Sequence, residues 1–150
     1  MKFYNREKEL ATLEKVRNMA FSNHSQMLVL TGRRRIGKTS LIFKSCEGSP
    51  TVYLFVSRSN EADLCARFIS EIRQSLDVYI PEIFKFGELF RFLMDLGKRM
   101  KYNLIIDEFQ EFYYVNPEIY SLLQDVWDRY RKESHVNLII SGSVYTLMNK

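Results

Sequence analysis

The chain has 150 residues, of which 46% are hydrophobic and 27% are charged. These proportions are typical of one globular domain with a real core, and they exclude a disordered chain. The formal net charge of +4 is spread along the chain, so it permits contact with nucleic acid without arguing for it.

The first predicted element is a helix within residues 1–22, after a short extended lead for which Asn5 is a candidate cap. Its apolar residues recur at helical spacing: Leu10, Leu13, Val16 and Ala20. A polar turn at 22–25 follows. The apolar run 27–30 then predicts a buried strand that leads directly into the most informative segment of the chain.

That segment has the spacing G-x-x-x-x-G-K-[ST], which is the phosphate-binding loop known as Walker A. Its glycines let backbone N–H groups turn inward around a phosphate, and the next helix directs its positive dipole end toward the same anion. In this motif Lys38 reaches the β- and γ-phosphates, and Thr39 offers its hydroxyl to Mg²⁺. The alternative is an incidental Gly-rich turn. The predicted phosphate-binding residues are Gly32, Arg33, Arg34, Arg35, Ile36, Gly37, Lys38, Thr39 and Ser40.

Three consecutive arginines occupy the tip of this loop. The sequence leaves open which of Arg33, Arg34 and Arg35 faces phosphate and which faces solvent, a partner protein or nucleic acid.

Strand-like and helix-like segments alternate over the rest of the chain. Strands are predicted at 51–57, 103–107 and 136–140. Helices are predicted from the phosphate loop to about 47, from a cap at Asn60 over 61–76, over 87–100, from a cap at Asn116 to about 132, and from Ser143 onward. This alternation implies right-handed crossovers and a mainly parallel sheet covered on both faces. The predicted fold class is therefore α/β, the three-layer α/β/α arrangement of P-loop NTPases, in a single domain over 1–150.

Ligands of such sheets bind beyond the carboxyl ends of the strands, so the phosphate loop, the acidic pair at 107–108 and Ser141 should meet at one edge. In an extended backbone the two neighbouring carboxylates point in opposite directions, so we expect different roles for them. Asp107 suits the Mg²⁺ shell together with Thr39. Glu108 suits the orientation and deprotonation of the water that attacks the γ-phosphorus. The alternative is a solvated strand end.

Three stretches, FYNREKEL at 3–10, GRRRIGKT at 32–39 and LIIDEFQ at 104–110, together resemble the archaeal-type ATPase family. That family belongs to the signal-transduction ATPases with numerous domains (STAND), which are relatives of AAA+ proteins. The resemblance implies that Ser141 is a polar sensor of the γ-phosphate, and its alternative role is a turn hydroxyl before Gly142. It also implies that the N-terminal lead lines an adenine pocket, with an apolar anchor for the first helix as the alternative: Phe3, Tyr4, Asn5 and Arg6.

The chain departs from the family pattern after its fourth strand. The family adds a fifth strand beside the phosphate-loop strand and a helical lid with a second sensor, and neither is found in the 150 residues. Without that strand, 27–30 would be an apolar edge. We therefore expect that the chain is the N-terminal piece of a longer protein, or that a neighbouring molecule covers this edge. Arg129 and Arg131 precede the fourth strand, so they are interpreted as a solvated helix end and not as a charge-neutralising arginine finger.

The expected function is hydrolysis of ATP to ADP with Mg²⁺, weak in the isolated fragment, which drives or times a change in C-terminal domains. One alternative is a nucleotide-dependent switch with little turnover. Another is a DNA-associated protein whose nucleic-acid surface lies elsewhere, and a homo-oligomer is compatible with each. Adenine is preferred over guanine because of the resemblance and because no Asn-Lys-x-Asp motif is present.

Three further expectations concern the cysteines, the cellular location and an aromatic cluster. The cysteines are isolated from each other and from both histidines, so neither a disulfide framework nor a zinc site is predicted. The opening residues form no secretory signal and no apolar run approaches membrane-spanning length, which predicts a cytoplasmic protein with no membrane partner. The aromatic cluster Phe109, Phe112, Tyr113 and Tyr114 is expected to be core and subunit contact, and not a base-stacking platform.

Overall fold

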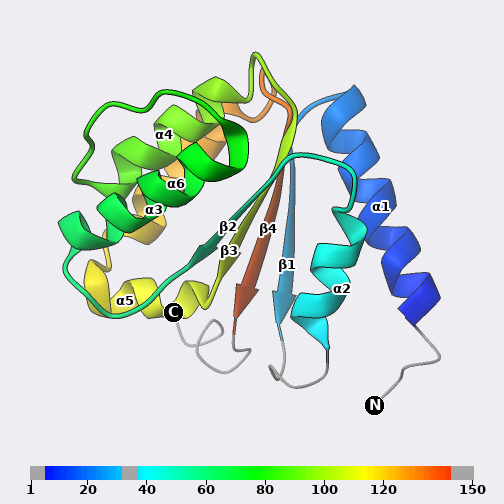
Figure 1. The fold of residues 1–150 in the computed structure, drawn as a ribbon, viewed down its shortest axis with the longest axis horizontal. Coiled ribbons are helices and arrows are strands. Elements are labelled where there is room, and N and C mark those ends of the chain that lie inside the picture. The colour runs from blue at the N-terminus through cyan, green and yellow to red at the C-terminus, as the bar shows by residue number, and fades with distance from the viewer. Residues whose placement is uncertain (1–5, 32–36, 143–150) are drawn as a thin grey trace.

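A parallel sheet forms the centre of the computed structural model, which describes residues 6–31 and 37–142 (Figure 1). In the order β1-β4-β3-β2, all neighbouring strands pair in parallel. The strands in chain order are β1 (Gln26–Thr31), β2 (Thr51–Phe55), β3 (Tyr102–Asp107) and β4 (Val136–Gly142). The predicted parallel α/β fold is confirmed, while the predicted cap at Asn5 and the predicted helix from Ser143 lie outside the described residues.

Helices cover both faces of this sheet, as Figure 1 shows. One face carries α1 (Arg6–Ser22) and α2 (Lys38–Ser45). The opposite face carries α3 (Glu61–Leu76), α4 (Phe86–Leu96) and α6 (Ile119–Tyr130). A 3₁₀ turn, η3 (Phe109–Glu111), and a short helix, α5 (Phe112–Val115), join β3 to α6. Because both faces are covered, every residue of β3 and β4 is buried.

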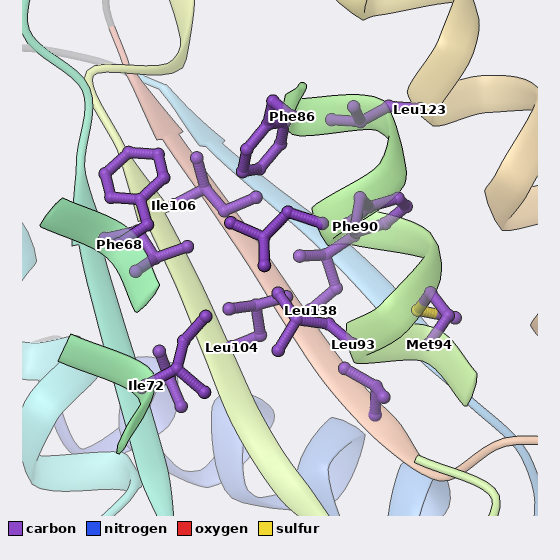
Figure 2. Close-up of a cluster of buried hydrophobic side chains, with 14 of the residues drawn as sticks. Phe68, Ile72, Phe86, Phe90, Leu93, Met94, Leu104, Ile106, Leu123 and Leu138 are labelled. Carbon is purple, nitrogen blue, oxygen red and sulfur yellow. The ribbon is translucent and has the colours of Figure 1, made fainter. Parts of the chain in front are cut away.

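The larger of the two apolar cores lies between the sheet and the helices α3, α4 and α6 (Figure 2). The smaller core lies between the sheet and α2, where Ile42 and Cys46 meet Ile105 and Ile139. Successive side chains of a strand point to opposite faces, so Asp107 lies on the same face of β3 as Ile105. The larger core includes Phe68, Ile72, Phe86, Phe90, Leu93, Met94, Leu104, Ile106, Leu123 and Leu138.

The helix ends show where local sequence signals were sufficient. Asn60 caps α3 as predicted, since its side-chain oxygen accepts a hydrogen bond from the Asp63 N–H at 2.8 Å. Asn116 accepts one from the Glu118 N–H at 3.1 Å, but this closes a turn, and α6 begins only at Ile119. The predicted start of that helix was therefore too early.

The helix α4 ends at Leu96, short of the predicted end near 100, because the backbone tightens there into i→i−3 hydrogen bonds. Gly97 at this point packs closely against the beginning of β4. A Cβ atom added to it would lie 2.4 Å from Val136 Cγ2 and 3.2 Å from the Met94 carbonyl oxygen. The close approach of the Val136 side chain to this backbone is what requires glycine here.

Substitution of Gly97 by Ala is accordingly expected to lower the free energy of unfolding by about 1–3 kcal/mol, the usual cost of overpacking. Urea unfolding monitored by circular dichroism would measure the change. Gly87→Ala is the matched control, because its added Cβ would meet the Leu122 side chain at 3.2 Å, and that side chain can move. If Gly97→Ala lowered the free energy of unfolding no more than Gly87→Ala, this explanation of the end of α4 would be wrong.

Candidate functional site

The carboxyl ends of the strands lie side by side at one edge of the sheet (Figure 1). The register pairs Thr31 of β1 with Gly142 of β4, and Phe55 of β2 with Asp107 of β3. The strands β3 and β4 are direct neighbours, and parallel strands lie about 4.8 Å apart. The ends of β1, β4 and β3 are thus adjacent, so the described parts of the predicted phosphate loop and acidic pair share this edge.

The second half of the phosphate loop leads into α2 through Gly37. This residue has φ 78° and ψ 16°, a left-handed conformation that glycine adopts without steric cost. The first N–H groups of a helix have no partner within the helix, and here they belong to the turn that contains Lys38, Thr39 and Ser40. Residues 32–36, which include the three arginines, lie outside the described residues.

The Lys38 side chain returns across the carboxyl edge of the sheet. Its Nζ donates a hydrogen bond to the Gly142 carbonyl oxygen at 3.3 Å, although the two residues are far apart in sequence. This contact brings the ammonium group to the end of β4, the strand next to β3 and its Asp107. Thr39 follows in the first turn of α2, where its side chain is half-buried.

Asp107 is 7% exposed, and both of its carboxylate oxygens accept hydrogen bonds. The Tyr53 hydroxyl donates to Oδ2 at 2.5 Å, and the Glu108 backbone N–H donates to Oδ1 at 2.9 Å. Tyr53 belongs to β2, and its ring packs at a tilt against Phe43 of α2, with ring centroids 5.1 Å apart. Sequence reasoning missed Tyr53, because the pattern of residues 51–57 indicated only a buried strand. Tyr53 lies near Asp107 because β2 pairs with β3 in the register that places Phe55 beside Asp107.

Glu108 departs from the conformation expected from the sequence. It has φ 57° and ψ 43°, so the strand ends at Asp107 and the chain turns at once into η3. The expectation of an extended pair with opposed side chains was therefore wrong; the Asp107 carboxylate accepts the Glu108 N–H and closes this turn. A left-handed non-glycine residue is uncommon and often marks a functional position. The Gln110 amide, which sequence reasoning also missed, donates to Glu108 Oε1 at 2.7 Å.

Ser141 is 1% exposed at the end of β4. It shares a face with Ile139, which packs on α2, so it lies on the phosphate-loop side of the sheet. Within residues 6–31 and 37–142, its hydroxyl has no hydrogen-bond partner. Because buried hydroxyls are normally paired, an orphan at this edge is compatible with a group that awaits a ligand.

Most of the N-terminal residues predicted from the family resemblance fall outside the part of the chain that the structure describes. Phe3, Tyr4 and Asn5 lie outside the described residues, and Arg6 is the first residue of α1. Arg129 lies on the exposed side of α6, where it forms an ion pair with Asp125 at 3.2 Å. This pair agrees with its interpretation as part of a solvated helix end.

The aromatic cluster divides between core and surface. Phe112 is fully buried and Phe109 packs against the same core, as expected. Tyr114 is 53% exposed, and the guanidinium of Arg58 lies 3.8 Å from the centre of its ring. Arg58 also forms an ion pair with Glu111 at 2.6 Å. The sequence showed no basic residue interleaved with the cluster, and only the fold brings one there.

Two oxygen-bearing side chains at this edge, Asp107 and Thr39, are candidate metal ligands. The part of the chain that the structure describes contains no group of three or more His, Cys, Asp or Glu side chains arranged to hold a metal by themselves. Mg²⁺ that accompanies a nucleotide takes one or two protein oxygens and completes its shell with water and phosphate. The Asp107 carboxylate and the Thr39 hydroxyl are donors of this kind.

The same described residues include no helix long and apolar enough to span a membrane.

The chain is similar over almost its whole length to known proteins. It is 32% identical over 148 residues to the MJECL04 protein of Methanocaldococcus jannaschii, a match that covers 99% of this chain and 31% of that relative. The chain therefore spans about a third of the length of that protein.

Solved structures show the same fold at lower identity. Cdc6p from Pyrobaculum aerophilum superimposes with a TM-score of 0.65 at 22% identity, covering 97% of this chain and 40% of that one. The Walker-type ATPase of Pyrococcus abyssi gives 0.65 at 20% identity, with 99% and 47% covered. The Aeropyrum pernix ORC2 protein, solved in ADPNP-ADP complexes, gives 0.63 at 20% identity, with 95% and 42% covered.

These likenesses agree with the parallel sheet and the helices on both of its faces. The family model described as an ATPase domain predominantly from Archaea matches residues 3–150. The chain belongs to this family of archaeal-type ATPase domains.

Proposed function

We propose that the chain binds ATP together with Mg²⁺ at the carboxyl edge of its sheet and hydrolyses the γ-phosphate. One observation carries the proposal. Lys38 Nζ donates a hydrogen bond to the Gly142 carbonyl oxygen at the end of β4, at 3.3 Å, and the neighbouring strand β3 ends at Asp107, directly before Glu108. A cation and two carboxylates on adjacent strand ends are the groups that bind a triphosphate, hold its metal and activate a water.

Each residue has a distinct proposed role. The N–H groups of residues 32–40 surround the phosphates, and Lys38 compensates their charge. Thr39 and Asp107 are the protein side of the Mg²⁺ shell, and bound Mg²⁺ would supply charge neutralisation at the β- and γ-oxygens. Ser141 has a buried hydroxyl that could donate to the γ-phosphate. The N-terminal residues proposed to line the adenine pocket are Phe3, Tyr4, Asn5 and Arg6.

Glu108 is proposed as the general base. Its carboxylate would orient the attacking water and accept a proton from it. The hydrogen bond from the Gln110 amide to Oε1 restricts the orientation of this side chain. The left-handed backbone at Glu108 turns this carboxylate away from the strand direction that Asp107 follows.

We also propose that the domain is part of a larger regulatory protein, in which hydrolysis drives or times a conformational change. The related MJECL04 protein is about three times as long as the matched region. In the described sheet β1 is an edge strand, and its Met27 and Val29 are 38% and 50% exposed. Apolar edges are normally covered, which supports a further strand or a neighbouring copy at this side.

Two alternatives remain distinct from hydrolysis. A nucleotide switch with little turnover is supported by the hydrogen bond that already holds Glu108 Oε1.

A DNA-associated role is supported by the fold of the Drosophila ORC that was solved bound to DNA, at a TM-score of 0.62 and 14% identity over 95% of this chain. Binding of the chain to duplex DNA that weakens steeply with salt would favour the second alternative.

Thermal unfolding with nucleotides tests the binding step. ATP with Mg²⁺, at one hundred times its Kd, should stabilise the fold by about 2.7 kcal/mol. For a domain of this size that corresponds to a Tm increase of roughly 5–10 °C. AMP, which lacks the β- and γ-phosphates, should give a much smaller shift, and GTP tests base preference. Equal shifts with AMP and ATP would show that the phosphate loop does not bind the triphosphate. Release of phosphate from ATP then separates hydrolysis from passive binding.

A further inference from the structure

We propose that Tyr53 is a positioning residue for Asp107 and thereby sets the affinity of the site for Mg²⁺. This inference rests on the proposed function. Its starting point is the short hydrogen bond, 2.5 Å, from the Tyr53 hydroxyl to Asp107 Oδ2. Bonds of this length between a hydroxyl and a carboxylate are charge-assisted, and they are about twice as strong as neutral ones.

The strand register explains why Tyr53 reaches this carboxylate. Tyr53 pairs with Ile105 and Phe55 with Asp107, so Tyr53 lies one pleat repeat behind the acid on the same face of the sheet. A long side chain is required to span this diagonal. The phenol ring spans it and places its hydroxyl at the Asp107 side chain.

The second contact of Tyr53 links the two halves of the site. Its ring packs on Phe43 at a centroid distance of 5.1 Å and an interplanar angle of 49°. Phe43 lies on α2, one helical turn beyond Thr39. Tyr53 therefore touches both the helix that begins with Lys38 and the strand that ends with Asp107. It is placed to maintain the spacing between the hydroxyl and carboxylate proposed to hold Mg²⁺.

The orientation of the Asp107 carboxylate is determined by two independent donors. Tyr53 holds Oδ2, and the Glu108 N–H holds Oδ1 at 2.9 Å. An ionised carboxylate has about four acceptor sites, so two bonds fix its plane and leave further sites for a water on the metal. Among the described residues, loss of the hydroxyl would leave the Glu108 N–H as the remaining donor to this carboxylate, which could then rotate.

The test compares Tyr53→Phe with the wild-type chain. Phenylalanine keeps the ring and its contact with Phe43 but removes the donor to Asp107. ATP affinity is measured by calorimetry over a range of Mg²⁺ concentrations and again in EDTA. We expect the Mg²⁺ concentration that gives half of the maximal increase in ATP affinity to rise by about 10-fold in Tyr53→Phe. The reason is that loss of a hydrogen-bond partner of a metal ligand usually lowers metal affinity 10–100-fold. Affinity in EDTA should be unchanged.

Tyr79→Phe is the matched control, because it makes the same chemical change at a side chain that is 82% exposed. Phe43→Leu is a second variant at a 41% exposed position. It removes the ring that supports Tyr53, keeps the hydroxyl, and should raise the Mg²⁺ requirement in the same direction by a smaller factor. It also keeps the proposal testable if Tyr53→Phe unfolds.

An unchanged Mg²⁺ requirement in both variants would overturn the assignment. Equal losses of ATP affinity with and without Mg²⁺ would also overturn it, because they indicate a structural role alone. Failure of the proposed function looks different: the wild-type chain would then bind no ATP, or bind it with no dependence on Mg²⁺.

Discussion

Substitution of Glu108 by Gln should reduce ATP turnover by about 10²–10⁴-fold, the usual contribution of a general base. ATP affinity should change little, because glutamine keeps the size and one carbonyl oxygen of the side chain. The Gln110 amide donates to Glu108 Oε1 at 2.7 Å, and that oxygen remains an acceptor in the variant. The variant therefore removes the basic group and retains its position. Steady-state phosphate release and calorimetric titration with ATP would measure the two effects separately.

Glu111→Gln is the matched control for this experiment. Glu111 is the last residue of η3, the 3₁₀ turn that begins directly after Glu108, and its carboxylate pairs with Arg58 at 2.6 Å. The same chemical change there should leave turnover close to that of the wild-type chain. Equal, low turnover in the wild type and in Glu108→Gln would reject the hydrolase and favour the nucleotide switch. Loss of ATP affinity in Glu108→Gln would instead assign Glu108 to binding.

The other large effect is expected at Lys38. Replacement by Ala should weaken ATP binding by roughly 10- to 150-fold, which corresponds to about 1.5–3 kcal/mol for a hydrogen bond to a charged group. Lys38 Nζ donates a hydrogen bond to the Gly142 carbonyl oxygen, a neutral acceptor, at 3.3 Å. A phosphate oxygen is a stronger acceptor at the same edge, so the ammonium group favours the bound state. Direct titration with ATP measures the loss.

Lys44→Ala provides the comparison, because Lys44 lies exposed in the last turn of the same helix. That substitution removes the same charge at the end remote from the phosphate loop and should leave ATP affinity nearly unchanged. If Lys38→Ala kept wild-type affinity, no form of the nucleotide proposal would survive, whether hydrolase or switch. Thermal unfolding of Lys38→Ala should first show that this variant is folded, and the ATP affinities are then compared.

Much of the fold could be predicted because the signals are local. Apolar runs bounded by turn residues identified the strands, and the Asn60 cap identified the beginning of α3. Helix ends were predicted less well where packing decides them. The end of α4 at Leu96 coincides with the close approach of Gly97 to Val136, which no local pattern reveals.

The segment after β3 shows the limit of pattern reasoning most clearly. Five aromatic or apolar residues occur within 109–115, and neither η3 nor α5 was predicted there. The segment is helical because Phe112 is buried against the core formed by α3 and α4. The guanidinium of Arg58, a residue remote in sequence, packs over the exposed Tyr114 ring of this segment.

The sequence by itself determined the phosphate-loop spacing, the acid at the end of a buried strand and the parallel α/β class, since these depend on residue order over short distances. Only the tertiary structure decided that Tyr53 holds Asp107, that Glu108 turns left-handed and that the Ser141 hydroxyl is buried. The reason is physical. Such contacts depend on strand register and on which face of the sheet each side chain occupies, and both are set by the packing of whole layers.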